Sequence, residues 1–242
     1  NTWSVDGFIT ECLQPAELGW GTHEIALPAQ GRMHEQGCGA AIAIDQPGHT
    51  IKVKSWSPNA LDFDAWLITH NEAISIADHL TWRCGDRVKY RPTAYYAYHP
   101  CDQAVESMAL LGRDNAARVR ERRVIKDEIA SGIDELGVFL ISDRFPALWL
   151  GSNLSIGKAR KHAPYNSATS LQVASSVVAA LEWVTLNPRA GVVESEQLDH
   201  EFVFERSVGY WSPMVCEYVA WRPRAGSSSL AFAEFLVAPD AR

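Results

Sequence analysis

The first 24 residues of the chain concentrate residue types that bind organic cations. A carboxylate supplies charge, a tryptophan face supplies cation–π attraction, and glycine allows close backbone approach. On composition, this opening segment predicts a pocket for an organic cation, whereas Trp3 taken alone is more typical of a core residue. The residues concerned are Trp3, Trp20, Glu11, Glu17, Glu24 and His23, with glycines at 7, 19 and 21.

A second polar cluster, Thr69-His70-Asn71-Glu72, ends the apolar run that begins at Ala65. Such a run predicts a buried strand, and polar residues at the end of a buried strand face either solvent or a pocket. Both interpretations stay open on position alone. A third cluster places Asp134 and Glu135 between two glycines, and a plain turn is the simpler interpretation of that segment.

Two further patterns resemble binding motifs only loosely. His23, His34 and Cys38 do not match the spacing of a known zinc site, so we expect no metal. The segment at 37–39, Gly-Cys-Gly, lacks the leading strand, the third glycine and the following helix of a dinucleotide-binding loop. A turn before a buried strand is the better interpretation.

The bulk composition argues against several classes of protein. The chain has 242 residues, of which 22 are basic and 29 acidic, and its net charge of −7 argues against nucleic acid as a partner. No apolar run approaches the roughly 18 residues of a membrane span, so no membrane is expected. Five cysteines without a C-x-x-C pattern predict reduced thiols and a cytoplasmic location.

The hydrophobic pattern predicts strands mixed with helices. Because the two do not alternate strictly, the pattern favours an α+β domain whose mixed or antiparallel sheet is covered by helices. The longest helix, at 168–186 with Asn166 as its cap, is apolar on nearly every side and should be buried or lie in an interface. Pro15 predicts a turn. The other expected elements are strands at 38–45, 51–57, 65–69, 95–98, 138–141, 147–151 and 202–205, a hairpin at 81–90, and helices at 72–80, 102–112 and 155–163.

Five blocks of the sequence resemble bacterial homospermidine synthases. They are Asn-Thr-Trp-Ser-Val-x-Gly-Phe at 1–8, Leu-Gln-Pro-Ala-Glu-Leu-Gly-Trp-Gly-Thr-His-Glu at 13–24, Thr-His-Asn-Glu-x-Ile-Ser-Ile-Ala-Asp at 69–78, Tyr-x-Tyr-His-Pro-Cys-Asp at 96–102 and Gly-Ile-Asp-Glu-Leu-Gly at 132–137. The resemblance runs along nearly the whole chain but covers only the carboxy-terminal half of those enzymes, which belong with the saccharopine dehydrogenase-like proteins.

This resemblance implies a domain organisation. Residues 1–242 would form the non-Rossmann domain of a saccharopine dehydrogenase-like enzyme, serving substrate binding and dimerisation. An amino-terminal Rossmann domain that binds NAD would be missing, and the start at Asn1 without an initiator methionine agrees with a fragment.

The resemblance also implies a reaction in which NAD is a bound and recycled cofactor. One putrescine would lose a hydride to give an imine, and ammonia would leave. A second putrescine would then attack, and the hydride would return to give homospermidine. The implied partners are putrescine and related polyamines, and the implied assembly is a cytoplasmic homodimer.

Carried over residue by residue, the resemblance implies roles for single side chains. Trp3 would be the cation–π residue of the pocket, and Glu11 would hold or deprotonate the substrate amine. His70 would lie beside the nicotinamide and the reacting carbon, and Asn1 would also contact the cofactor. Asp134 would bind an ammonium end of the substrate, with its neighbour Glu135 left open as an alternative.

Two other functions remain open on the sequence. A related polyamine reductase of the carboxynorspermidine dehydrogenase type would need an arginine for its carboxylated substrate, and the matched blocks contain none near Glu11 or His70. Alternatively, the isolated chain is a module that binds polyamines or dimerises without catalysis.

Overall fold

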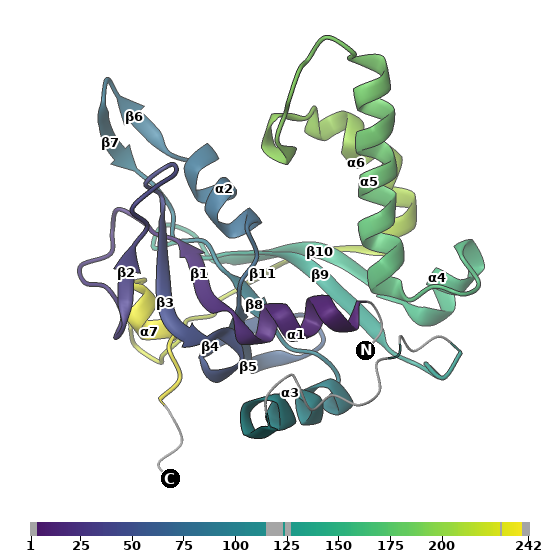
Figure 1. Ribbon diagram of the computed structural model, residues 1–242, viewed down its shortest axis with the longest axis horizontal. Coiled ribbons are helices and arrows are strands. Elements are labelled where there is room, and N and C mark those ends of the chain that lie inside the picture. Colours follow the sequence, from purple (N-terminus) through teal and green to yellow (C-terminus); the bar gives the residue numbers. More distant parts are fainter. Residues whose placement is uncertain (1–3, 115–122, 124–126, 228, 239–242) are drawn as a thin grey trace. The chain divides into compact units, whose positions relative to one another are not determined.

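The computed structural model describes residues 4–114, 123, 127–227 and 229–238. These residues form two units, which we describe separately (Figure 1). Unit 1 contains residues 4–5, 123, 127–141 and 146–220. Unit 2 contains residues 6–114, 142–145, 221–227 and 229–238, so the chain enters it more than once.

Unit 2 contains most of the strands. Its sheets have the strand orders β1-β3-β2, β4-β5-β8 and β6-β7, and every one of these pairs is antiparallel. Its elements are α1 (Val5–Leu13), β1 (Pro15–Gly19), β2 (Gly31–Met33), β3 (Ala41–Pro47), a 3₁₀ turn (Gly48–Thr50), β4 (Lys52–Ser57), β5 (Leu61–Ile68), α2 (Glu72–His79), β6 (Trp82–Cys84), β7 (Arg87–Tyr90), β8 (Tyr96–Tyr98), α3 (Asp102–Asp114) and α7 (Phe232–Phe235).

The core of unit 2 forms where β1, β3 and β5 bury their apolar residues. Leu18, Ile42 and Leu67 are fully buried. Helix α2 packs against β1 across Gly19, where an added Cβ would lie 2.3 Å from the Cβ of Ala77. A side chain at position 19 would therefore push α2 away from the sheet.

Unit 1 is built on an antiparallel sheet of order β11-β10-β9. Gln172 is 1% exposed, and its side-chain amide donates hydrogen bonds to the Ser152 hydroxyl at 2.7 Å and to the Asp134 carbonyl at 3.3 Å, which fixes α5 on the sheet. The elements of this unit are β9 (Ile133–Leu140), β10 (Ala147–Ser155), α4 (Ile156–His162), α5 (Ala168–Leu186), a 3₁₀ turn (Ser195–Gln197), α6 (His200–Trp211) and β11 (Met214–Val219).

Helices mixed with antiparallel sheets confirm the predicted α+β class. One expectation was wrong: residues 202–205 lie in α6 rather than in a strand. The alternating Phe-Val-Phe sequence is typical of a strand, but Asp199 caps a helix by accepting hydrogen bonds from the backbone N–H groups of Glu201 and Phe202 at 3.1 and 3.2 Å. Helical spacing also places Arg206 over the Phe202 ring, 3.4 Å from its centroid.

Several smaller expectations are also corrected. Pro15 opens strand β1 rather than a turn, which is possible because β1 is an edge strand. The cap of α5 is Ser167, whose hydroxyl accepts a hydrogen bond from the Ser170 N–H, and not Asn166. The segment with Asp134 and Glu135 is part of β9 rather than a turn, because it pairs with β10 along its length.

Helix α5 is long and apolar enough to cross a membrane by length and composition alone. This is weak evidence for a span, since helices of proteins that enter no membrane pass the same test. One side of α5 packs against the rest of unit 1, and Leu171, Gln172 and Ala179 are buried on that side.

Candidate functional site

Glu11 lies near the end of α1, and the surrounding residues fix that end in place. The His49 ring N–H donates to the Cys12 carbonyl at 2.8 Å, and the Gly48 N–H donates to the Gln14 carbonyl at 3.1 Å. Gly48 itself fits tightly against β5, because an added Cβ would lie 2.6 Å from the Leu67 carbonyl oxygen. These contacts hold the end of α1 beside the end of β5.

His70 follows β5 directly, and Thr69 fixes that strand end. The buried Thr69 hydroxyl donates to the Pro15 carbonyl at 2.6 Å and accepts a hydrogen bond from the Glu17 N–H at 2.9 Å. Thr69 therefore makes two hydrogen bonds to β1. Because β1 directly follows α1 in the chain, these bonds hold His70 close to Glu11.

The imidazole of His70 lies between two carboxylates. Its Nε2 is 3.6 Å from Oε2 of Glu11, and its Nδ1 is 3.6 Å from Oε2 of Glu72, the first residue of α2. These distances are ion-pair contacts, slightly longer than direct hydrogen bonds. The side chain of Glu11 is 21% exposed, that of His70 28%, and that of Glu72 66%. Accessibility to solvent therefore increases from Glu11 through His70 to Glu72.

One face of the imidazole is covered by Tyr96. This residue pairs with Ile68 across β8 and β5, two positions before His70. The two rings are stacked, with centroids 4.0 Å apart and planes inclined by 30°. The stack covers a face of the ring, whereas the two nitrogens that carry its protons lie on the ring edge and meet Glu11 and Glu72.

The pKa of His70 is raised above its ordinary value. Partial burial disfavours the charged ring and would lower the pKa, but the attraction of Glu11, and then of Glu72, outweighs it. The ring is therefore held as an imidazolium over a wider pH range than a free histidine. Such an arrangement can accept a proton from one carboxylate side and release it on the other.

Asp134 lies in unit 1, on β9. Successive strand residues point to opposite faces, so Asp134 and Glu135 lie on different faces of the sheet. Burial raises the pKa of the Asp134 carboxyl, a side-chain hydrogen bond with Thr169 partly lowers it, and Glu135 raises it further. Its Oδ2 is buried and has no hydrogen-bond partner among the described residues. A buried carboxylate oxygen without a partner is suited to receive an ammonium donor.

The other residues implied by the resemblance lie outside the described residues. These are Asn1 and Trp3. The structure therefore brings together Glu11 and His70, which are 59 positions apart in the sequence, and adds Glu72 and Tyr96 to them. The polar cluster at the end of β5 contains Glu72, and the aromatic run at 95–98 contains Tyr96, but nothing in the spacing of either indicated that they meet His70.

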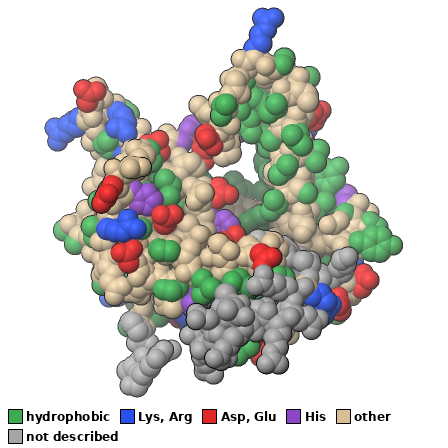
Figure 2. Space-filling model, in the orientation of Figure 1, with side chains coloured by type: hydrophobic (Ala, Val, Ile, Leu, Met, Phe, Trp, Pro, Cys, Tyr) green, Lys and Arg blue, Asp and Glu red, His purple; other side chains and the backbone are tan. Residues whose placement is uncertain are grey.

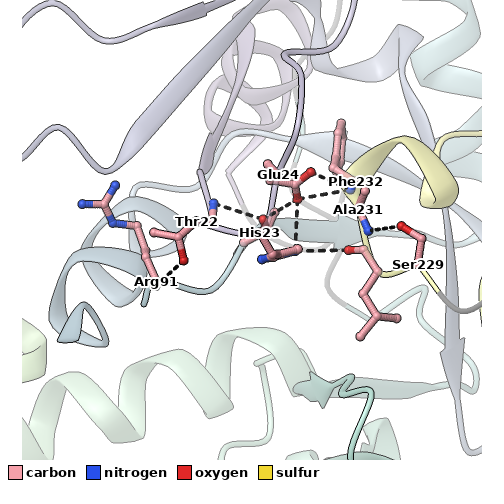
Figure 3. A network of polar contacts seen from close by, with 10 residues as sticks. Thr22, His23, Glu24, Arg91, Ser229, Ala231 and Phe232 are labelled. Carbon is pink, nitrogen blue, oxygen red and sulfur yellow. Dashed lines mark hydrogen bonds and ion pairs between the residues drawn. The ribbon is translucent and has the colours of Figure 1, made fainter. Parts of the chain in front are cut away.

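Two other residues of the opening segment, Trp20 and Glu24, make contacts inside unit 2; the surroundings of Glu24 are shown in Figure 3. The Glu24 carboxylate is 2% exposed and accepts hydrogen bonds from the Thr93 hydroxyl at 2.6 Å and the Phe232 N–H at 3.0 Å, with His23 Nε2 at 3.3 Å. Trp20 packs edge-on against Phe232, with ring centroids 6.0 Å apart. Glu24 and Trp20 thus hold α7 in place. The Glu24 carboxylate is already occupied by hydrogen-bond donors from within the protein.

The described residues do not by themselves fit a metal or a dinucleotide. Among them, no three His, Cys, Asp or Glu side chains gather closely enough to hold a metal ion. Gly37 and Gly39 have φ of 91° and 66°, but they lead into β3 and no helix follows. Every strand pair in the described sheets is antiparallel, whereas a dinucleotide fold needs parallel strands joined by helices.

Comparisons with known proteins agree with the resemblance seen in the sequence. The chain is 47% identical to the homospermidine synthase of Blastochloris viridis over 231 residues, covering 95% of this chain and 48% of that protein. It is 45% identical to the homospermidine synthase of Mesorhizobium japonicum over 225 residues, covering 92% and 46%. The chain therefore spans about half the length of the curated relatives that it matches.

A solved structure supports the same relationship. The homospermidine synthase of Legionella pneumophila, crystallised in complex with NAD, superposes with a TM-score of 0.89 at 38% identity and covers 98% of this chain and 54% of its own. The profile of the saccharopine dehydrogenase C-terminal domain family matches residues 1–209, most of the chain. The chain belongs to the saccharopine dehydrogenase C-terminal domain family.

Proposed function

We propose that this chain forms the substrate-binding part of a homospermidine synthase, which condenses two putrescines to homospermidine with release of ammonia. The observation that carries the proposal is the row Glu11–His70–Glu72 in a chain that is similar to homospermidine synthases over 95% of its length. A diamine needs a carboxylate to bind its ammonium group and a route by which a proton can leave. Glu11 supplies the first, and His70 with Glu72 supplies the second.

The proposed reaction requires the Glu11–His70–Glu72 row to remove a proton from the bound diamine. An amine with an ordinary pKa of about 10 is charged at neutral pH, and it must lose its proton before it can react. Glu11 is the least exposed member of the row and binds the ammonium. His70 releases its Nδ1 proton to Glu72, whose side chain is 66% exposed and exchanges with water, and takes up the proton of the ammonium from the Glu11 side at Nε2.

Two further residues belong to the proposal. Asp134, with a buried oxygen free of partners among the described residues, binds an ammonium end of a polyamine. Trp3, which lies outside the described residues, is the proposed cation–π residue, and such an attraction is worth roughly 0.5–2 kcal/mol. Its aromatic face stabilises a moving charge without fixing it at one point.

We propose that NAD is bound mainly by residues that do not belong to this chain. When bound, it accepts and later returns the hydride of the diamine. The described residues do not fit a dinucleotide fold, and the relatives are about twice as long as this chain. We assign the dinucleotide to an NAD-binding domain corresponding to the half of the relatives that this chain does not span, and only Asn1 and His70 of this chain to its neighbourhood.

The proposed setting is a cytoplasmic homodimer that acts on polyamines without nucleic acid or a membrane as partner. Five free cysteines, four of them exposed, agree with a reducing compartment.

A fusion protein tests the proposed activity. This chain, joined to the half of the Blastochloris viridis enzyme that it does not match, is incubated with NAD and putrescine, and products are separated by chromatography. We expect homospermidine and ammonia from the fusion, much less from its Glu11→Gln variant, and no product from the 242-residue chain alone.

Two results would contradict the proposal. One is a folded fusion that binds NAD but makes no homospermidine, and the other is a Glu11→Gln variant as active as its parent. Calorimetry with putrescine and the isolated chain provides a measurement that does not depend on the fusion. Product from the isolated chain would refute the assignment of NAD to other sequence.

A further inference from the structure

Helix α5 buries polar side chains and exposes apolar ones. Apolar atoms gather along α5 in the space-filling view (Figure 2), and Val178 and Leu181 are 63% and 60% exposed. On the side that packs against the rest of unit 1, Gln172 and Ser175 are 1% and 8% exposed. Glutamine is rarely buried to this extent, because its amide must then find hydrogen-bond partners inside the protein. Burial of Gln172 therefore requires a partner for each of its polar atoms.

The neighbouring groups fix the orientation of the Gln172 amide. Its Nε2 donates to the Ser152 hydroxyl oxygen at 2.7 Å and to the Asp134 backbone carbonyl at 3.3 Å. The Ser152 hydroxyl donates its own proton to the Trp211 carbonyl at 2.5 Å, so its oxygen can only accept at Gln172. The Asp134 carbonyl likewise only accepts. Because both neighbours need a donor, the amide nitrogen faces them, and the amide oxygen Oε1 is left without a donor.

The carboxylate of Asp134 lies at the same contact between α5 and the sheet. Asp134 pairs with Leu154 across β9 and β10, and paired residues of antiparallel strands point to the same face. Leu154 packs with Leu171 of α5, so the Asp134 side chain points toward α5 as well. There the Thr169 hydroxyl hydrogen-bonds to the Asp134 carboxylate. Thr169 precedes Gln172 by three positions, which places both on one face of α5.

Two buried oxygens at this contact lack a donor. They are Oε1 of Gln172 and Oδ2 of Asp134, neither of which has a hydrogen-bond partner among the described residues. The donors of Gln172, Ser152 and Thr169 are already used within the contact. A buried acceptor without a donor costs free energy, and folded proteins satisfy nearly all of them. Two such oxygens, one of them on a carboxylate, are suited to a ligand that carries several N–H donors and a positive charge.

We propose that the side-chain oxygen of Gln172 accepts a hydrogen bond from the same ammonium group that Asp134 binds, and that the two acceptors together select a primary ammonium. This inference rests on the role of Asp134 in the proposed function and adds a specificity-determining residue to it. A primary ammonium has three N–H donors, enough for Asp134, for Gln172 and for one water. A tertiary ammonium has a single N–H, so one of the two oxygens stays unpaired against a methyl group.

A water molecule fits the two oxygens less well than an ammonium. Water can donate to both, and buried waters commonly join unsatisfied polar groups in this way. It brings no charge, however, and the raised pKa of Asp134 shows that its surroundings alone stabilise the carboxylate poorly. An ammonium supplies N–H donors and the opposite charge together, and charge-assisted hydrogen bonds are about twice as strong as neutral ones.

Calorimetry on the 242-residue chain tests the proposal with two ligands. They are putrescine and its tetramethyl derivative, in which both amines carry two methyl groups, so that either end is tertiary. Gln172→Met keeps the length of the side chain and removes its acceptor. We expect it to weaken putrescine binding by about 10-fold or more, as the loss of a hydrogen bond to a charged group predicts. Binding of the tetramethyl compound should change much less, so the preference for putrescine should shrink by nearly the same factor.

Two matched variants separate ligand binding from packing. Ser152→Ala removes a hydrogen bond that holds Gln172 but leaves Oε1 in place. It should lower the midpoint of urea unfolding and keep the preference between the two ligands. Ser207→Ala changes another buried hydroxyl of unit 1, which is 0% exposed and has no partner among the described residues. It should leave both affinities unchanged.

A measurement on the wild-type chain needs no substitution. The side-chain carbonyl carbon of Gln172 is followed by NMR in a chain that contains carbon-13 glutamine. Its signal should shift when putrescine is added, because the carbonyl oxygen gains a donor, and it should shift much less with the tetramethyl compound.

Three outcomes would overturn the inference. They are no binding of putrescine by the wild-type chain, a ligand preference that Gln172→Met leaves unchanged, and a Gln172 carbonyl signal that putrescine does not move, as expected of a site that holds only water. The fusion enzyme separates these failures from a failure of the proposed function. If the wild-type fusion makes homospermidine and its Gln172→Met variant has the same KM for putrescine, Gln172 has no part in the site and the proposed function stands. If the fusion is inactive, the proposed function fails, whereas the calorimetric preference still decides the role of Gln172.

Discussion

At the scale of single residues, the central observation is a histidine held between two carboxylates. Glu11 is the more buried of the two and Glu72 the more exposed, so the row has a direction from the interior to solvent. The raised pKa of His70 comes from the attraction of these carboxylates acting against burial. The two carboxylates allow the ring to transfer a proton, and their ion pairs with the ring also stabilise the folded chain.

The first prediction concerns the titration of His70. Its pKa is raised in the folded chain, so the ion pairs contribute fully below the unfolded value of about 6.5 and are lost as pH rises through the folded pKa. We expect the His70 ring signal, followed by NMR, to titrate above 6.5. The midpoint should fall in Glu11→Gln and, by less, in Glu72→Gln.

A matched comparison separates this effect from general destabilisation. Glu205→Gln changes an exposed acid elsewhere and should leave the His70 midpoint unchanged. If the midpoint is the same in wild type and Glu11→Gln, the carboxylates do not set the charge of the ring, and the proposed proton route loses its basis.

The second prediction concerns the stacking of Tyr96 on His70. In the fusion enzyme, Tyr96→Phe keeps the stacked ring and should retain most of the turnover. Tyr96→Leu removes it, and the loss of an aromatic contact of about 0.5–1.5 kcal/mol should lower turnover roughly 2- to 10-fold. The measurement is the initial rate of homospermidine formation with putrescine at saturation.

The His70 midpoint, recorded for both Tyr96 variants, shows how the stack acts. If both variants keep the wild-type rate and the wild-type midpoint, the stack does not position the ring. A rate that falls below the wild-type value by the same factor in both variants would instead point to the hydroxyl.

At the scale of elements, the short helix α7 is held within unit 2 partly by a buried carboxylate. Glu24 accepts hydrogen bonds from Thr93 and from the first N–H of α7 at Phe232, and it lies beside His23 (Figure 3). Burial would raise the pKa of Glu24, but the hydrogen bonds from His23, Thr93 and Phe232 outweigh burial, and the net shift is downward. A group with a lowered pKa stabilises the fold above its unfolded value and loses that contribution as pH falls through the folded one.

The third prediction follows from this attachment. Glu24→Gln keeps the shape of the side chain but removes its charge, and we expect a loss of about 2–3 kcal/mol in the free energy of unfolding, because charge-assisted hydrogen bonds at a buried group are removed. The loss should shrink in acid, where the wild-type carboxylate is protonated as well. Urea unfolding at several pH values measures both effects.

Thr93→Val isolates one contact in the same network. It removes the hydrogen bond from the Thr93 hydroxyl to Glu24 and the one that this hydroxyl accepts from the Gly21 N–H. A Glu24→Gln variant that unfolds like the wild type would show that the carboxylate charge does not hold α7, and a Thr93→Val variant that does so would show that the Thr93 hydrogen bonds add nothing to stability.

The elements also show what the sequence can and cannot predict. Runs of apolar residues correctly predicted β3, β4, β5 and the long α5, because their periodicity reflects the side that is buried. Helix α6 was missed, since Phe202 and Phe204 alternate as in a strand and the cap at Asp199 was not recognised. Local pattern fails where a cap or a tertiary contact overrides it.

The site was less accessible to sequence reasoning than the fold. Composition and position marked Glu11 and His70 as separate candidates, and only the resemblance assigned both to one site, because no spacing rule joins residues 59 positions apart. Tyr96 meets His70 only through the pairing of β8 with β5, and Glu72 only through the start of α2. Contacts of this kind depend on strand register and on a helix start, which a sequence pattern locates only approximately.

At the scale of the whole molecule, the chain forms two units, and the chain path passes from one to the other more than once. Leu67 is fully buried in unit 2. Leu154 is 1% exposed and packs with Ala159, Ala168 and Leu171 in unit 1. Leu67 and Leu154 belong to different units, so a cavity at either one should be felt first by the amides of its own unit.

The fourth prediction uses this separation. Leu67→Ala and Leu154→Ala each create a cavity, which costs about 2–5 kcal/mol at a buried leucine. We expect hydrogen exchange, followed by mass spectrometry, to accelerate mainly in β1, β3 and β5 for Leu67→Ala, and mainly in β9, β10 and the first turns of α5 for Leu154→Ala. Equal acceleration throughout the chain in both variants would mean that the two units open as one cooperative body. In that case the Glu11–His70 row and Asp134 would share a single unfolding equilibrium, and stability changes at one could not be separated from those at the other.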